Sequence, residues 1–438
     1  MKRIVLKLSF VSVVTVMTAL ITGCDPATDI KEPELIIDPV YPPETIELTK
    51  AEQGMVNSSN EFAFNLFKQI RESTNLTMRS IVVSPISITY ALGMLNNGAA
   101  GNTQAQINRV LGFSETGASG INDFCYKMQS MLPALDSLTK ILIANTIYMN
   151  EGYELNPEFT QIANTYYNAY PVTRKFDNQT LDAINKWASD NTEQMIDKVL
   201  DERSFDSNAV SYLLNAIYFK GSWTYKFDKA LTKPTHFIHA GDADEEVTCQ
   251  MMCMNDVKLE YTQNEDYQAV RLPYGNGSFQ MTILLPRKKK NVPSNGLPIV
   301  PTIETWNELN NAMDSVEITE LKIPRLETET DIDLIPIMSA LGMPEAFGTE
   351  ADFRNFCNTS AYIGLMKQVA KIKLDEEGTE AAAVTVIGVK NTMGPQESVI
   401  FNADHPFLYF ISERNTGTIL FIGQCTGNGS DFSEYSSI

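Results

Sequence analysis

The chain has 438 residues, of which 43% are hydrophobic and 20% charged, a composition that excludes a fibrous or largely disordered protein. A formal net charge of −20 opposes binding to nucleic acid or anionic lipid, which require clustered basic residues. No linker rich in Pro, Gly and Ser divides the chain after about residue 50, so we expect one large domain.

The N-terminus has the pattern of a targeting segment over residues 1–23. Three basic residues precede an apolar run at 8–21, which is too short for a permanent membrane span. The run ends in Leu-Ile-Thr-Gly before Cys24, which resembles the lipobox of bacterial lipoproteins and implies a lipid on Cys24. The alternative is an ordinary secretory peptide with a chance cysteine. Both interpretations predict export, and the first predicts a bacterial cell-envelope lipoprotein.

Three further boundaries follow from composition. Residues 24–50 hold many acids and prolines with little periodicity, which is typical of an extended tether. We expect the folded domain over 51–427 and a C-terminal tail over 428–438. Without residues 1–23 the net charge is 31 minus 54, or −23.

Periodicity predicts the elements of the domain in chain order. Apolar residues at helical spacing predict a first helix over 58–72. A short apolar strand at 81–83 is followed by a helix of small and apolar residues, which must be buried on most of its surface. The other expected elements are strands at 141–149, 212–223, 321–326, 401–411 and 418–423, alternating strands and turns over 247–286, and helices at 156–169, 178–198, 306–313 and 333–342.

The cysteines apart from Cys24 are five: Cys125, Cys249, Cys253, Cys357 and Cys425. An odd number without dense spacing is no disulfide framework, and no zinc-type spacing is present. Two of them, Cys249 and Cys253, would lie about 13 Å apart on one strand face, too far for a disulfide. We expect small buried hydrophobes with at most one disulfide, and no metal or cofactor.

Catalytic motifs are missing from the sequence. Its three histidines, His236, His239 and His405, accompany no nucleophile elbow, Cys/His signature or zinc-protease motif. No glycine-rich nucleotide loop occurs either. We therefore predict that the protein is not an enzyme, and that His405 forms local hydrogen bonds.

Several segments together resemble the serpin family. These are Ser-Pro-Ile-Ser-Ile at 84–88, Asn-Asn-Gly-Ala-Ala-Gly-Asn-Thr at 96–103, Asn-Ala-Ile-Tyr-Phe-Lys-Gly at 215–221 and the apolar strands at 401–411 and 418–423. The resemblance runs in order from Glu52 to Gln424. It implies an α+β fold of large, mainly antiparallel sheets, about eight or nine helices and an exposed reactive-centre loop. The residues alone predict a large α+β domain with long antiparallel strands.

One stretch, residues 372–393, contains contradictory local signals. Its alanines favour a helix, whereas uncharged residues at alternate positions from Thr379 to Val389 favour a strand with one buried face. The stretch contains the hinge pattern of inhibitory serpins: Glu376, Glu377, Gly378, Thr379, Glu380, Ala381, Ala382 and Ala383.

The resemblance implies a suicide-substrate inhibitor. A protease attacks the loop and becomes acylated, and the cleaved loop then inserts into the main sheet and drags the protease with it. Inward positions must be small and uncharged because a buried charge opposes insertion, and Thr379, Ala381, Ala383 and Thr385 meet that demand. The expected partners are serine proteases, with cysteine proteases as a second class, and the expected state is a monomer. The alternative is a non-inhibitory surface binding or adhesion lipoprotein with this fold.

The cleavage site has two interpretations. The family's spacing from hinge to scissile bond places it at Thr392-Met393. Lys390-Asn391 would suit a trypsin-like protease, because Lys390 is the basic residue of the loop. Cleavage there would leave two fewer residues to insert, or about 6 to 7 Å less travel.

Two further clusters carry over from the family. Ser84, Ser87 and Asn215 match the shutter cluster beneath the main sheet, where Gln368 replaces the usual histidine. An amide both donates and accepts hydrogen bonds but does not titrate, so bonding survives without pH sensitivity. Trp223, Arg325 and Glu376 match the breach cluster at the top of that sheet, with Arg325 as the basic partner of Glu376.

Overall fold

The computed structural model describes residues 45–73, 76–241, 246–287, 296–379, 398–427 and 432. The chain divides into two compact units, Met1–Val40 and Tyr41–Ile438, and the described residues lie in the second. The predicted signal segment, Cys24, the loop positions 380–397 and most of the C-terminal tail lie outside the described residues.

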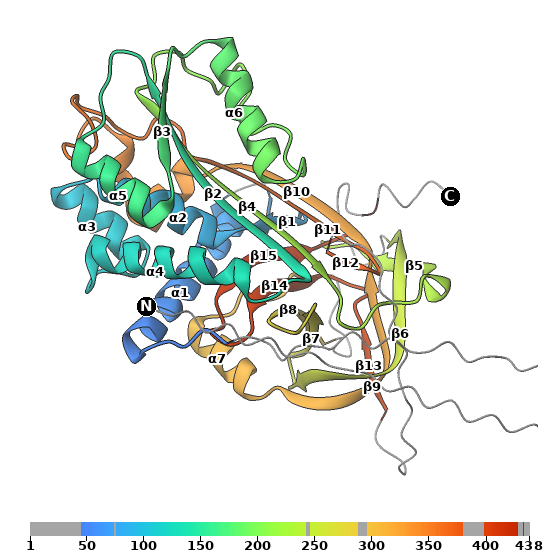
Figure 1. Ribbon diagram of the computed structural model, residues 1–438. Helices are drawn as coiled ribbons and strands as arrows, with labels where there is room; N and C mark the ends of the chain where they lie inside the picture. The colour runs from blue at the N-terminus through green and yellow to red at the C-terminus, as the bar shows by residue number, and fades with distance from the viewer. Residues whose placement is uncertain are drawn as a thin grey trace, which may run out of the picture. The chain divides into compact units, whose positions relative to one another are not determined.

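A six-stranded sheet has the order β10-β11-β12-β4-β2-β3 (Figure 1). Its neighbouring strands are antiparallel except for β2 and β3. The strands are β2 Thr139–Asn150, β3 Tyr170–Arg174, β4 Ser211–Ser222, β10 Leu326–Asp333, β11 Lys367–Leu374 and the two-residue β12 Gly378–Thr379.

A nine-stranded sheet contains the remaining strands in the order β1-β15-β14-β8-β7-β6-β9-β13, with β5 paired to β6. Strands β14 and β15 are buried at every residue, and their sequences are mainly apolar, as strands covered on both faces require. The bounds are β1 Ile81–Val83, β5 Lys233–Ile238, β6 Glu246–Gln263, β7 Tyr267–Tyr274, β8 Phe279–Pro286, β9 Asp314–Pro324, β13 Val399–Asn402, β14 Phe407–Glu413 and β15 Ile419–Cys425.

Eight α-helices occur within the described ranges, so the predicted α+β class is confirmed. Helix α2 is buried at almost every residue because it packs on β4, β15 and α4. The helices are α1 Lys50–Ser73, α2 Pro85–Asn96, α3 Gly101–Val110, α4 Gly117–Met131, α5 Pro157–Tyr167, α6 Asn178–Asn191, α7 Ile303–Asn311 and α8 Ile335–Leu341, with 3-10 turns η1 Leu132–Ala134, η2 Lys229–Leu231 and η3 Pro344–Phe347.

Two predicted helix boundaries differ from the structure by seven or eight residues. Helix α1 begins at Lys50 rather than at 58, because Thr49 and Glu52 cap it reciprocally: Thr49 N donates to Glu52 Oε2 at 2.7 Å and Glu52 N to Thr49 Oγ1 at 3.3 Å. Helix α6 ends at Asn191 rather than at 198, because Glu193 and Gln194 have positive φ angles of 51° and 66°.

Helix α6 and the main core lie on opposite faces of the six-stranded sheet. A small separate cluster packs α6 against the sheet: Tyr148, Phe176, Leu181, Ile184, Leu200 and Tyr212. The larger core takes the other residues of the same strands, among them Ile147, Ile217 and Phe219. The sheet is therefore covered on both faces over β2 and β4.

The cysteine and histidine predictions are confirmed for the described residues. The five cysteines there are buried and free, and none forms a disulfide. Both nitrogens of His405 bond locally, to Asp404 Oδ1 at 2.8 Å and to the Pro286 carbonyl at 2.7 Å. Within the same ranges there is no group of three metal-ligating side chains and no helix able to cross a membrane.

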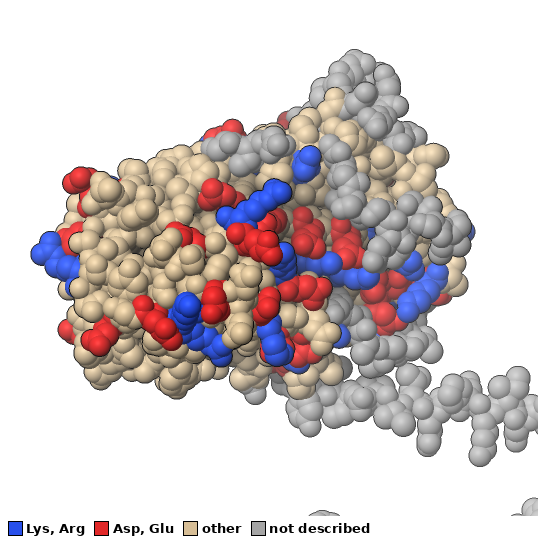
Figure 2. All heavy atoms as spheres, turned by 90° about the horizontal axis from the view of Figure 1, so that it is seen from above, with Lys and Arg blue, Asp and Glu red and all other residues tan. Residues whose placement is uncertain are grey.

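Charged side chains of both signs are interspersed on the face seen in Figure 2. Cross-strand ion pairs join β10 to β11, with Lys371 Nζ 2.9 Å from Glu327 Oε1 and Lys367 Nζ 2.8 Å from Asp331 Oδ2. The described side chains of that face therefore form no broad region of a single sign.

Candidate functional site

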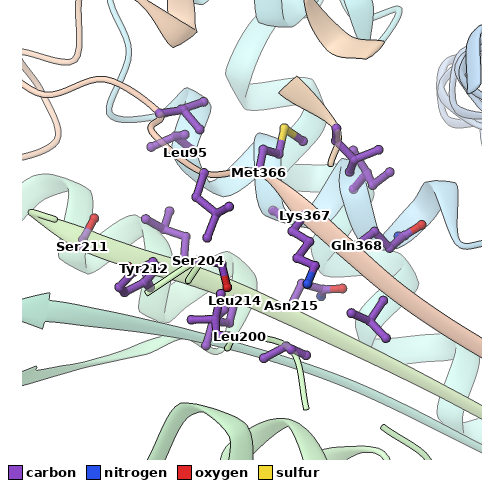
Figure 3. A pocket seen from close by; sticks show the side chains of 18 of the residues that line it. Leu95, Leu200, Ser204, Ser211, Tyr212, Leu214, Asn215, Met366, Lys367 and Gln368 are labelled. Carbon is purple, nitrogen blue, oxygen red and sulfur yellow. The ribbon is translucent and has the colours of Figure 1, made fainter. Parts of the chain in front are cut away.

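A slot separates β4 from β11 in the six-stranded sheet. The two residues of β12 occupy its top, where Thr379 pairs with Leu374 on one side and Gly221 on the other. Beyond Thr379 no ladder joins β4 to β11 in the described part of the chain. A cavity of about 640 Å³ lies there instead. Figure 3 shows Tyr212, Leu214 and Asn215 on one wall and Met366, Lys367 and Gln368 on the other.

The slot lies between α2 and α6. Ser84, Ser87 and Leu92 reach it from the region of α2. Trp187 and Leu200 reach it from α6 and the segment that follows α6. The slot is therefore lined by both apolar and polar side chains.

The mouth of the slot is a turn at residues 375–377, which the indole and backbone of Trp223 hold in place. Trp223 Nε1 donates to the Asp375 carbonyl at 2.9 Å, and Trp223 N to the Glu377 carbonyl at 2.8 Å. The indole stacks on Tyr274, with ring centroids 4.4 Å apart and an interplanar angle of 11°. These contacts fix where the chain enters the slot.

The Glu376 side chain is buried at the mouth, with 1% of its surface exposed. Arg325 Nε donates to both carboxylate oxygens at 2.9 Å, and Arg325 Nη2 donates to Oε1 at 2.6 Å. The Thr232 hydroxyl also donates to Oε1. Burial alone would raise the pKa of Glu376, but the Arg325 and Thr232 hydrogen bonds outweigh it and hold the pKa below its ordinary value.

The neighbouring Glu377 pairs with two lysines. Its oxygens lie 2.7 Å from Lys226 Nζ and 3.0 Å from Lys229 Nζ. The hydrogen bond from Lys226 lowers the pKa of Glu377, and Lys229 adds to that effect. Both hinge glutamates are therefore held as carboxylates near neutral pH.

Gly378 and Thr379 lead from the turn into the slot. Gly378 has φ +150°, and a Cβ there would lie 2.1 Å from the Gly221 oxygen, so the close approach to β4 requires glycine. Thr379 is 2% exposed, and its hydroxyl lies 2.7 Å from the Tyr274 hydroxyl in the core. Its side chain therefore points inward, towards the larger core.

The shutter residues form two separate pairs at the start of α2, where Ser84 is the N-cap residue and Ser87 lies in the first turn. On the β11 side, Gln368 Nε2 donates to the Ser84 carbonyl at 2.8 Å, and Ser84 N donates to Gln368 Oε1 at 3.1 Å. On the β4 side, the Ser87 hydroxyl donates to Asn215 Oδ1. No hydrogen bond joins Gln368 to Asn215 in the described residues. Each wall of the slot is thus tied to the first turn of α2 independently.

The β4 pair extends into a polar chain. Asn215 Nδ2 donates to Asn145 Oδ1 at 2.8 Å, and Asn145 Nδ2 donates to the Tyr167 carbonyl at 2.8 Å. Asn145 was not among the predicted site residues. Its signal in the sequence is a polar residue in the middle of the apolar run at 141–149.

Comparison with known proteins identifies the fold. The serpin model, described as serine protease inhibitor, matches residues 57–427. The chain belongs to the serpin family. Iripin-8 of Ixodes ricinus is 31% identical over 402 residues, covering 86% of this chain and 94% of that protein. Serpin B8 of Homo sapiens is 33% identical over 384 residues, covering 84% and 98%. The structure of tengpin, a thermophilic serpin in the native state, has a TM-score of 0.76 and 26% identity, covering 88% and 96%.

In this serpin the predicted breach residues Trp223, Arg325 and Glu376 lie together at the mouth of the slot. The positions Glu380 to Ala383, Lys390, Asn391, Thr392 and Met393 lie outside the described residues. Tyr274 and Thr232, which contact the hinge directly, were missed, because the end of a strand and a connecting segment carry no signal for a contact so distant in sequence.

Arg325→Met should lower the free energy of unfolding by about 3 kcal/mol, because it leaves the buried Glu376 carboxylate without its main partner. The measurement is chemical denaturation of the uncleaved protein. Lys186→Met is the matched control. It breaks the exposed Lys186–Asp190 pair, whose side chains are 74% and 58% exposed, and should cost less than about 0.5 kcal/mol. Equal effects of the two variants would contradict this account of the mouth.

Glu377→Gln should destabilise the protein in a pH-dependent way. The folded-state pKa of Glu377 is lowered, so its contribution to stability is complete above the unfolded-state pKa of about 4.3 and is lost as pH falls through the folded value. The variant should be less stable than the parent at neutral pH and converge with it in acid. Denaturation curves across that range test this, and a difference independent of pH would refute it.

Proposed function

We propose that this serpin inhibits serine proteases as a suicide substrate, by inserting the cleaved segment after Thr379 into the slot between β4 and β11. One observation carries the proposal: the chain already enters the slot as a strand at Gly378–Thr379, paired on both sides, with open space ahead of it. A strand that continued in this register would complete the sheet.

The inward side chains of the segment fit that register. Because the pairing is antiparallel, each residue after Thr379 would pair one position earlier in β11 and in β4. Thr385, six residues on, would then lie between Gln368, six before Leu374, and Asn215, six before Gly221. Its hydroxyl would meet two amides at the shutter. The other inward positions, Ala381 and Ala383, are small and uncharged.

The outward side chains fit the other face. Val384 and Val386 would lie opposite Ala216 and Leu214 of β4, counted from the same pairs. Leu214 packs against the apolar cluster beneath α6. Both faces of the segment thus match the two environments that it would enter.

The chemistry of the target sets the order of events. The protease serine attacks the carbonyl of the scissile residue, the peptide bond breaks, and the new amino terminus leaves with the downstream fragment. The upstream segment remains joined to the serine as an ester. If this segment inserts before water hydrolyses the ester, it would carry the attached protease along the slot.

We further propose that the protein is exported and anchored through a lipid on Cys24, as a monomer in the bacterial cell envelope. The residues around the expected cleavage site favour two target classes. Lys390 would suit a trypsin-like protease, whereas Val389, Thr392 and Met393 would suit elastase-like, subtilisin-like or chymotrypsin-like proteases.

Thr385→Arg should convert the inhibitor into a substrate. Burying an unpaired guanidinium costs several kcal/mol, and this cost would oppose insertion of the loop. The parent protein, incubated with trypsin, elastase, chymotrypsin and subtilisin, should give a complex stable in SDS with at least one of them. The variant should be cleaved by the same protease without a complex. Thr385→Ser keeps the hydroxyl and should behave as the parent.

The unfolding temperature before and after loop cleavage gives an independent test. A large rise after cleavage is expected from insertion. An unchanged temperature, together with no complex from the parent, would favour the non-inhibitory binding lipoprotein instead.

Cleavage should fall at Thr392-Met393, so that mass spectrometry of the released C-terminal fragment finds Met393 as its first residue. Ser211, the first residue of β4 and the last that an antiparallel segment would reach, would lie opposite position 389 in the register set by Thr379. Cleavage after Thr392 leaves three residues, 390–392, between that last pair and the protease, whereas cleavage after Lys390 leaves one. A fragment beginning at Asn391 would instead assign Lys390 and a trypsin-like target.

A further inference from the structure

A row of charged side chains crosses the outer face of the six-stranded sheet and is interrupted by the slot. Strand pairing puts Glu327 of β10 opposite Lys373 of β11 on one side of the slot. It puts Lys220 of β4 opposite Lys140 of β2 on the other side. The neighbours of Lys373 along β11, Ile372 and Leu374, are buried in the core, so Lys373 lies on the opposite, outer face.

The charges of this row do not balance. Lys373 Nζ lies 3.4 Å from Glu327 Oε2, and Lys140 Nζ lies 2.7 Å from Glu193 Oε1. Lys220 has no ion pair within 4 Å in the described chain and lies directly opposite Lys140. Like charges in direct cross-strand register are destabilising. Of these three lysines, Lys373 and Lys140 each have a glutamate partner, and Lys220 is the one without an ion pair in the described chain.

The register of β12 identifies the missing carboxylate. Thr379 pairs with Leu374 and Gly221, so the next residue of a continued strand would pair with Lys373 and Lys220. That residue is Glu380. Because Thr379 points into the core, the Glu380 side chain would point outward, between the two lysines.

We propose that Lys220 and Lys373 are positioning residues that receive the Glu380 carboxylate, one from each wall, as the first residue of the loop to enter the slot. The inference rests on the proposed function and adds an electrostatic step to it. The row would then read Glu327, Lys373, Glu380, Lys220, Lys140 and Glu193, with three charges of each sign. Pairing at the first step favours insertion in its competition with hydrolysis of the ester.

The location suits a charge that enters from water. The Lys373 side chain is 34% exposed and that of Lys140 is 48% exposed, so Glu380 would keep part of its hydration. The next outward position, Ala382, carries no charge. Its neighbour on β11 would be Lys371, which already lies 2.9 Å from Glu327 and 3.5 Å from Glu329. A carboxylate is therefore needed at position 380, between Lys373 and Lys220, and not at position 382, beside Lys371.

The test measures the number of inhibitor molecules cleaved for each protease trapped as an SDS-stable complex. Lys220→Gln, Lys373→Gln and Glu380→Gln should each raise this number by about two- to fivefold, the effect of losing one partly exposed ion pair. The parent's number should rise with added salt, and that of Glu380→Gln should respond less. Lys220→Arg should restore the parent value.

Lys371→Gln is the matched control, since it removes a lysine from the same strand and face opposite Ala382, and it should leave the number unchanged. Adding Glu380→Gln to the Lys220→Gln, Lys373→Gln double variant should have no further effect, which a merely structural role of the lysines would not produce. The proposal that both lysines receive Glu380 would be overturned if Lys220→Gln and Lys373→Gln had effects no larger than that of Lys371→Gln. It would also be overturned if only one of the two variants had an effect. Absence of any complex from the parent would overturn the proposed function itself.

Discussion

The buried carboxylate of Glu376 is the constraint on which the mouth of the slot depends. A charge with 1% exposure requires strong partners, and Arg325 and Thr232 supply them from two other segments of the chain. The pair fixes the turn at 375–377, and that turn delivers Gly378 between β11 and β4. Because Gly378 passes so close to the Gly221 oxygen, its position leaves little choice in the register that follows.

The contact between Thr379 and Tyr274 determines which of the following residues would face the core and which would face outward. Side chains alternate along a strand, so a slip of one residue would exchange the two faces. Glu380 would then point into the core, and the alanines would face α6 and the solvent. The hydroxyl pair at 2.7 Å therefore selects the one arrangement in which the small residues face inward and the carboxylate faces outward.

The sequence was sufficient to predict what depends on local pattern. The buried helix α2 follows from its unbroken small and apolar residues, and the breach residues follow from the resemblance. Contacts set by the register of distant strands could not be predicted. Asn145 and Asn215 meet across 70 positions, and the opposition of Lys220 to Lys140 exists only once β2 and β4 are aligned. The shutter was expected as one cluster, but the slot divides it into two.

The open slot also explains where the energy for insertion would come from. Its walls present backbone groups of β4 and β11 without a strand between them. An inserted segment would add on the order of ten backbone hydrogen bonds at about 1 kcal/mol each, which approaches the stability of an entire domain. In the described residues the strand in the slot ends at Thr379, and the next strand along the chain, β13, begins at Val399 and belongs to the other sheet. Cutting between these points removes the restraint at one end, so that proteolysis itself releases the strand.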